Sequence, residues 1–171
     1  LMKEVLEQMG DEKPSHIFLP AGCGGLAAGV ISYLWKHTES RDIKLISIES
    51  EHSNCVMNSV KKNEPAFVNI SNETVMVGLS CGEVSSEAWK VLSSTLSHCV
   101  SISDKAVAPL MTLFANGSLG GGKIEAGECA TSGAASLLAI LKDKKLKRQV
   151  GLTDNSVILL IGTEGATDLK A

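Results

Sequence analysis

Strongly apolar segments of strand length alternate with helical patterns along this chain, and this alternation restricts the fold more than any other feature. The clearest strand candidates are residues 15–20, 43–50, 99–104 and 155–161. Their apolar residues run nearly without interruption, which is typical of strands buried on both faces. Helical patterns separate them. The sequence therefore predicts an α/β fold, in which helices cover both faces of a mostly parallel sheet.

Periodicity and end residues indicate where the helices lie. We expect helices over residues 1–10, 27–37, 53–62, 86–95, 106–116 and 133–142. Asp104 is a predicted N-cap for the fifth of these. The segment from Thr74 is interpreted as a short strand or extended run that breaks at Gly78. The basic run at residues 142–148 is interpreted as the solvated end of a helix.

Composition narrows the classes of protein to consider. The chain has 171 residues, of which 44% are hydrophobic and 20% charged, enough for one globular unit with a sizeable core. A net charge of −3 without a basic stripe argues against nucleic acid as a partner. No apolar run has the length of a membrane span and no signal peptide opens the chain, so we expect a cytoplasmic protein. Five cysteines without a C-x-x-C pair predict no metal site.

Four turns of small residues follow the predicted strands. They are AGCGG, GLSCGE, AGECATSG and GTEGATD, beginning at residues 21, 78, 126 and 162. Ligands of parallel sheets bind outside the carboxyl ends of the strands, and glycine allows a backbone to approach a ligand closely. We therefore expect these four turns to surround one site.

The first turn is the strongest candidate for binding. Gly22, Gly24 and Gly25 precede a helix, whose free amide groups and positive end favour an anion such as phosphate. A tight turn without a ligand is the structural alternative. A nicotinamide cofactor is another, because Glu49 follows the next strand, although Gly29 comes one position late for G-x-G-x-x-G.

Larger motifs carry a family resemblance. The segments PAGCGGLAAGV, ISIESEHSNCV, MVGLSCGEVSSEAW, AGECATSGAASLLAIL and VILLIGTEGATD resemble, in this order, the C-terminal half of the diaminopropionate ammonia-lyase family. That family belongs to the fold type II group of pyridoxal-phosphate enzymes, with the tryptophan synthase β chain and threonine dehydratase. The resemblance covers nearly the whole chain. Its most specific part is GLSCGE followed by the S-x-x-A-W helix start.

The resemblance implies a pyridoxal 5'-phosphate-dependent lyase that eliminates ammonia from 2,3-diaminopropionate and yields pyruvate and ammonia. It assigns the cofactor phosphate to the amide groups of Gly22, Cys23, Gly24, Gly25 and Leu26. It places Gly78 and Leu79 beside the cofactor ring, and Thr163 opposite the pyridine nitrogen. Glu128 matches a glutamate near the ring that orients substrate or steers protonation, and it is the one catalytic candidate in this chain.

Departures from the family pattern limit what this chain is expected to do alone. Gly162 and Ala166 stand where relatives commonly have serine and aspartate, while Asp168 remains as a tail residue. Glu49 and His52 are interpreted as structural or surface residues. The family's Schiff-base lysine lies upstream of the matched region. We therefore expect residues 1–171 to be a single α/β unit, the C-terminal fragment of a longer two-domain enzyme, and inactive in isolation.

The resemblance also implies partners: a small amino-acid substrate, the missing N-terminal half of the same enzyme, and a second copy in a homodimer. Two alternatives stay open. One is another fold type II lyase, such as a threonine or serine dehydratase, which would differ chiefly around residues 80–83. The other is a non-catalytic module that binds phosphate or the cofactor.

Overall fold

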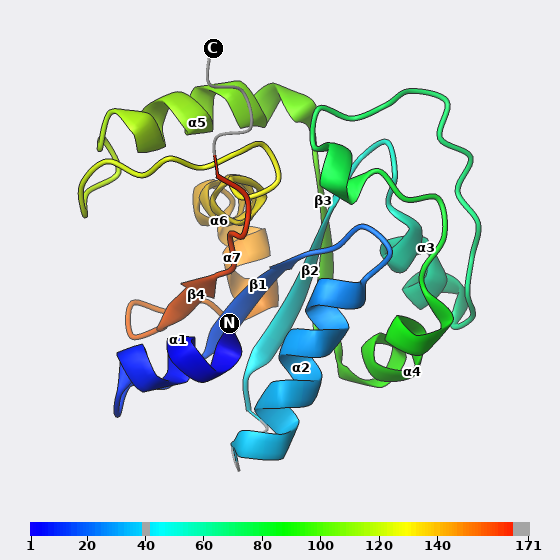
Figure 1. The fold of residues 1–171 in the computed structure, drawn as a ribbon, viewed down its shortest axis with the longest axis horizontal. Coiled ribbons are helices and arrows are strands. Elements are labelled where there is room, and N and C mark those ends of the chain that lie inside the picture. The colour runs from blue at the N-terminus through cyan, green and yellow to red at the C-terminus, as the bar shows by residue number, and fades with distance from the viewer. Residues whose placement is uncertain (39–41, 166–171) are drawn as a thin grey trace.

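The computed structural model describes residues 1–38 and 42–165, and it contains one parallel sheet of four strands. The strands are β1 (His16–Pro20), β2 (Lys44–Ser50), β3 (His98–Ile102) and β4 (Ile158–Leu160). Their order across the sheet is β3-β2-β1-β4, and every described pair is parallel. The predicted parallel sheet is therefore confirmed (Figure 1).

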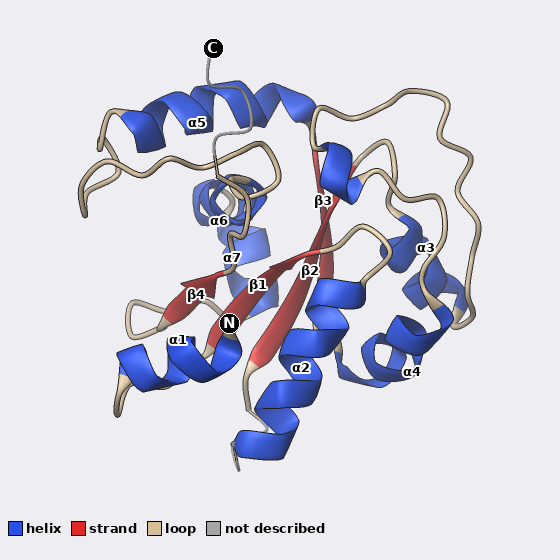
Figure 2. Ribbon diagram, in the orientation of Figure 1, coloured by secondary structure: helices blue, strands red, loops and turns tan. Residues whose placement is uncertain are grey.

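Helices lie on both faces of this sheet, as expected (Figure 2). On one face are α1 (Met2–Met9), α2 (Gly25–His37), α3 (Cys55–Lys62) and α4 (Ser86–Thr95). On the other are α5 (Val107–Ala115), α6 (Ser132–Lys142) and α7 (Lys144–Val150). Side chains of β1 alternate between the two cores: Ile17 and Leu19 join the first and Phe18 the second. All three are fully buried, which is why the strand is apolar throughout.

Two expectations about local structure were wrong, and a third was right in part. Residues 74–76 form no strand, and Val77–Leu79 is a 3-10 helix. Of the four small-residue turns, only the first and the last follow a strand; the other two follow irregular segments. The basic run at residues 142–148 is largely exposed, as expected, but it spans the end of α6 and the start of α7, because α6 stops at Lys142 and α7 begins at Lys144. The carboxylate of Asp143 caps α7 by accepting from the amides of Lys145 and Leu146.

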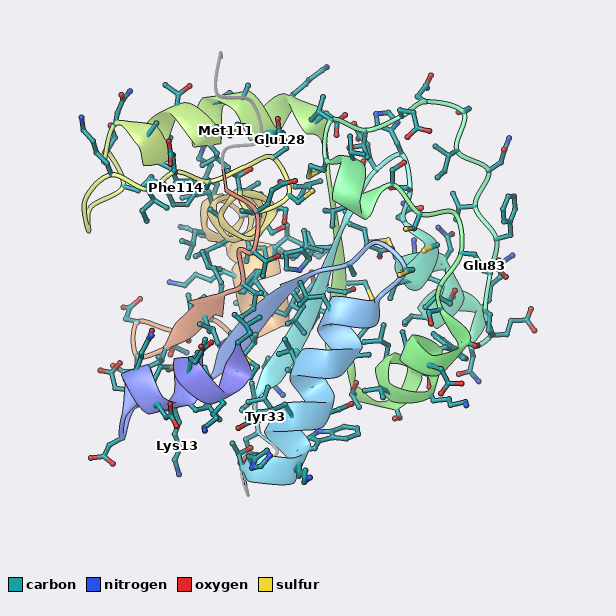
Figure 3. The ribbon with its side chains drawn as sticks, viewed as in Figure 1. Lys13, Tyr33, Glu83, Met111, Phe114 and Glu128 are labelled. Carbon is teal, nitrogen blue, oxygen red and sulfur yellow. The ribbon has the colours of Figure 1, made fainter. Side chains whose placement is uncertain are left out.

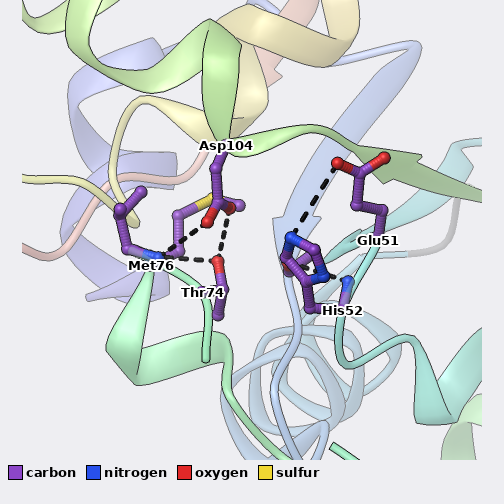
Figure 4. Close-up of polar contacts among 7 residues, drawn as sticks. Glu51, His52, Thr74, Met76 and Asp104 are labelled. Carbon is purple, nitrogen blue, oxygen red and sulfur yellow. Dashed lines mark hydrogen bonds and ion pairs between the residues drawn. The ribbon is translucent and has the colours of Figure 1, made fainter. Parts of the chain in front are cut away.

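Asp104 is not the N-cap of α5. It opens a 3-10 helix, Asp104–Ala106, and Ala106 precedes α5. Its carboxylate instead accepts hydrogen bonds from the Thr74 hydroxyl (2.6 Å) and the Val75 amide (2.9 Å). The Met76 amide in turn donates to Thr74 Oγ1 (3.2 Å), and Figure 4 shows these contacts. Asp104 therefore fixes the segment that leads into the Gly78 turn.

No helix within residues 1–38 and 42–165 has both the length and the apolar character needed to cross a membrane.

Candidate functional site

All four small-residue turns meet at one cavity of about 240 Å³, at the end of the sheet where β1 leads into α2. The cavity is lined by Pro20, Gly22, Cys23, Gly24, Gly25, Leu26, Gly78, Leu79, Cys129, Ala130, Thr163 and Glu164. The expectation that the four turns surround one site is confirmed. The eight residues that the resemblance assigned to the cofactor all line this cavity.

The N-terminus of α2 opens toward this cavity, and no group among residues 1–38 and 42–165 caps it. Gly24 is the N-cap residue, and no side chain caps the helix. In the described part of the chain, the amides of Gly24, Gly25, Leu26 and Ala27 donate to no other residue. Unpaired amides at the positive end of a helix bind anions. The first turn of α2 is therefore a candidate anion site.

The glycines of the first turn are required by close packing. Gly24 has φ of +87°, and a Cβ there would lie 2.6 Å from Cδ1 of Leu92 in α4. A Cβ on Gly22 would lie 2.8 Å from the backbone oxygen of Gly78. Both contacts are shorter than real Cβ atoms make. Backbone blocks the position at Gly22, and the positive φ adds to the side-chain contact at Gly24, so both positions favour glycine. The first two turns touch each other through backbone atoms, which fixes the wall of the cavity.

The last two turns are held together by Glu164, a residue that sequence reasoning missed. Its carboxylate accepts from the Cys129 amide (2.5 Å), and its backbone oxygen accepts from the Gly127 amide (3.0 Å). A Cβ on Gly127 would lie 2.6 Å from Cγ of Glu164. The sequence marks Glu164 and Glu128 equally, because each is an acidic residue inside a small-residue turn.

Glu128 does not line the cavity, although Cys129 and Ala130 do. Figure 3 shows it on the segment that leads into α6, and its backbone oxygen accepts from the Thr131 hydroxyl (2.9 Å). Its predicted part in the chemistry stays a prediction. Thr163 lines the cavity, whereas Ala166 and Asp168 lie outside the described residues.

Cys129 lies half-buried beside the second turn. Burial and, to a smaller extent, the nearby Glu164 carboxylate together raise the pKa of its thiol to about 11. A Cβ on Gly78 would lie 3.1 Å from Cys129 Sγ. The thiol is therefore protonated at neutral pH and packs as a small apolar group.

Glu49 has a structural role, as expected. Its fully buried carboxylate accepts from the amides of Val56 (2.7 Å) and Met57 (2.8 Å) in the first turn of α3. Burial raises its pKa to about 7, although these two amide hydrogen bonds lower it in part. His52 is partly exposed and pairs with Glu51 at 4.0 Å (Figure 4). Neither residue lines the cavity.

Comparisons with known proteins agree with this geometry. A model of the pyridoxal-phosphate dependent enzyme family matches residues 1–163. The chain is 30% identical to diaminopropionate ammonia-lyase of Escherichia coli K12 over 175 residues, which is 99% of this chain and 44% of that protein. It is also 30% identical to the biosynthetic L-threonine dehydratase of Haemophilus influenzae, over 68% of this chain and 22% of that protein.

A solved structure agrees as well. The crystal structure of holo diaminopropionate ammonia-lyase from Escherichia coli superposes with a TM-score of 0.87, at 29% identity, over 99% of this chain and 43% of that chain. The chain belongs to the pyridoxal-phosphate dependent enzyme family, and its fold is the fold type II arrangement that the resemblance implied. The chain spans less than half the length of these relatives.

The cavity fits the phosphate of the family's cofactor. The amides around Gly24 have no hydrogen-bond partner among the described residues, and no side chain of that part of the chain caps this helix. A Cβ at Gly22 or Gly24 would come closer than 3 Å to neighbouring atoms. Glycine at these positions leaves the backbone amides accessible to a ligand. Such a cradle of backbone donors suits a phosphate group.

Proposed function

We propose that this chain is the cofactor-phosphate half of a pyridoxal-phosphate-dependent lyase that eliminates ammonia from 2,3-diaminopropionate. The observation that carries the proposal is the single cavity into which the four turns and the open end of α2 converge. The 30% identity to diaminopropionate ammonia-lyase over nearly the whole chain supports the substrate. Residues 1–171 then form one α/β unit of a longer cytoplasmic enzyme, which acts as a homodimer.

Each residue of the cavity has a role in this proposal. The amides of Gly22, Cys23, Gly24, Gly25 and Leu26 bind and orient the phosphate. Gly78 and Leu79 form the wall beside the cofactor ring. The hydroxyl of Thr163 contacts the pyridine nitrogen, since Gly162 offers no side chain. Glu128 holds a proton near the ring. When bound, the cofactor supplies the electron sink for eliminating ammonia.

The proposal also explains what this chain needs from elsewhere. The lysine that holds the cofactor aldehyde is expected in the upstream half of the longer enzyme, together with the groups that cover the ring. An open cavity stays wet, which weakens the electrostatic contacts that a closed site strengthens. We expect this chain alone to bind pyridoxal phosphate weakly, through its phosphate, and without a covalent bond.

The test compares two proteins. The longest in-frame reading frame that contains this chain is expressed with pyridoxal phosphate. Release of ammonia and of the 2-oxo acid product, pyruvate or 2-oxobutyrate, is measured from 2,3-diaminopropionate, threonine and serine. Preference for 2,3-diaminopropionate is the expected result. The chain alone is treated with pyridoxal phosphate and then borohydride. Stoichiometric labelling of one lysine together with ammonia release from the chain alone would contradict the proposal.

A threonine or serine dehydratase is the second candidate. The 30% identity to L-threonine dehydratase, over 68% of this chain, favours it. The same assay separates the two, because a dehydratase would prefer the hydroxyl substrates. A non-catalytic binding module would release ammonia from none of the three.

A further inference from the structure

Two cysteines from separate turns lie close together beside the cavity, which Cys23 lines. The Cys23 sulfur lies 4.0 Å from the position of a Cβ on Gly25, and Cys23 is a neighbour that acts on the pKa of the Cys81 thiol. A Cβ on Gly22 would lie 3.1 Å from Cys81 Sγ, so this sulfur packs directly against the β1–α2 turn. Sulfur atoms gather in this region in Figure 3, where they are drawn in yellow.

The backbone holds the two cysteines in this position. The Ser85 amide donates to the Cys23 backbone oxygen (2.9 Å), which ties the first turn to the start of α4. The Cys81 amide donates to the Leu79 backbone oxygen (2.9 Å), which closes the second turn. Because both turns are fixed on each side of the sulfur pair, the thiols stay close without large movements of the chain.

The two thiols differ in access. Cys23 is exposed, so a small oxidant reaches it from solvent, whereas Cys81 is half-buried. Burial raises the pKa of the Cys81 thiol, and the Cys23 sulfur beside it adds to this effect. The third sulfur of the region, Cys55, is fully buried, and its thiol donates to the Gly22 backbone oxygen (3.5 Å). It is therefore shielded from the same oxidant.

We propose that Cys23 and Cys81 form a reversible dithiol–disulfide pair that responds to peroxide at the mouth of the cavity. Hydrogen peroxide oxidises the exposed Cys23 thiol to a sulfenic acid and is reduced to one water. The Cys81 sulfur then attacks the Cys23 sulfur, an S–S bond forms, and a second water leaves with the Cys81 proton. In total two thiols lose two electrons and two protons to one peroxide. A dithiol reductant reverses the reaction.

The experiment uses the reduced chain, with hydrogen peroxide as the oxidant. After treatment, free thiols are blocked and the protein is digested with trypsin without reduction. Lysines at positions 36, 44, 61, 62 and 90 place Cys23, Cys55 and Cys81 on three different peptides, so mass spectrometry identifies each link. We expect a Cys23–Cys81 linked peptide, and a fall in free thiols from the five of the reduced chain to about three, restored by dithiothreitol.

Variants separate the two steps. Cys81→Ser should trap sulfenic acid on Cys23, detected with dimedone, and Cys23→Ser should remove the linked peptide. Cys99→Ser, a matched substitution on β3 outside the pair, should form the link as the unaltered chain does. Circular dichroism checks that each variant is folded, and Cys23→Ala repeats the test at the exposed position. A Cys55–Cys81 link, or sulfenic acid that accumulates on Cys23 in the unaltered chain without a bridge, would overturn the proposal.

Discussion

Two helices begin at the same edge of the sheet, and their N-termini are filled in opposite ways. The first turn of α3 is satisfied from within, because the buried Glu49 carboxylate accepts from the Val56 and Met57 amides. The first turn of α2 has no such group, and its amides line a cavity. An unfilled N-terminus costs stability unless water or an anion satisfies its donors. The difference shows which of the two ends is free to bind a ligand.

A second contrast supports the same conclusion. Another cavity, of about 700 Å³, lies beside β3 and is lined mainly by apolar side chains of β3, α6 and α7. The smaller cavity, about 240 Å³, is lined largely by glycines and backbone. By volume alone, the cavity beside β3 would be the better candidate for a ligand site. The cavity at the N-terminus of α2 is the better candidate for a phosphate site, because phosphate binding depends on hydrogen-bond donors such as free amides more than on volume.

The largest effect is expected from Gly24→Val, which destroys the open end of α2. The left-handed backbone at φ +87° and the 2.6 Å approach of a Cβ to Leu92 both disfavour valine. Strain of about 1–2 kcal/mol and overpacking of about 1–3 kcal/mol predict a loss of roughly 2–5 kcal/mol in unfolding free energy, with loss of pyridoxal-phosphate binding. Urea unfolding and a cofactor titration measure both.

The matched control is Gly29→Val in the same helix, where an added Cβ meets nothing within 4 Å. It should change stability by less than about 0.5 kcal/mol, since valine and glycine differ little in helix propensity. Equal losses in the two variants would show that α2 rejects valine anywhere, and that Gly24 has no special role.

At the N-terminus of α3, we expect Glu49→Gln to change how the unfolding free energy depends on pH. Burial raises the pKa of Glu49 from 4.5 to about 7 in the folded chain. Between these values the unfolded chain releases the proton while the folded chain keeps it. The carboxyl group therefore lowers stability as pH rises from 4.5 to 7, by about 3 kcal/mol at ~1.4 kcal/mol per pKa unit, with no further change above 7.

Glu49→Gln should remove this slope. Urea unfolding at pH 4.5, 6 and 7.5 measures it, with the exposed Glu51→Gln as the control that keeps the slope. If the slope is the same in the unaltered chain and in Glu49→Gln, the pH dependence comes from another group.

A smaller effect is expected from Gly25→Asp, which would give α2 the kind of acidic partner that α3 already has. Gly25 is exposed and a Cβ there meets only Cys23 Sγ at 4.0 Å, so aspartate fits. A carboxylate in the first turn should stabilise the helix by about 0.5 kcal/mol. It should also repel phosphate and weaken pyridoxal-phosphate binding about tenfold, near 1.4 kcal/mol. Gly25→Asn is the neutral control, and binding as weak in this variant would exclude charge as the cause.

The fold was largely predictable from the sequence because buried parallel strands have a strong signature. Strands β1 and β2 are buried on both faces and rich in apolar residues, so their place inside the sheet follows largely from the residues. Helix α4 was predicted with the bounds that the structure has, Ser86–Thr95. The run at residues 74–79 misled the prediction, because its valines resemble a strand, whereas the Asp104 carboxylate holds this segment in an irregular path.

The parts of the site that are built from glycine turns were predictable from the sequence. The parts that depend on where a side chain points were less predictable. Glycines mark the turns in the sequence, and glycines do line the cavity. The choice between Glu128 and Glu164 had no local signal, because both are acidic residues in small-residue turns. Only the fold shows that Glu164 reaches across 35 residues to the Cys129 amide.

The most direct test of the account is whether the open end of α2 binds phosphate. The chain is labelled with ¹⁵N and titrated with inorganic phosphate while its amide signals are followed by NMR, with chloride at equal ionic strength as the control. The amides of Gly24, Gly25 and Leu26 should shift together and saturate, and those of Val56 and Met57, already bonded to Glu49, should not move. Shifts confined to the basic residues of α7 or to the cavity beside β3, with the α2 amides unchanged, would contradict the account.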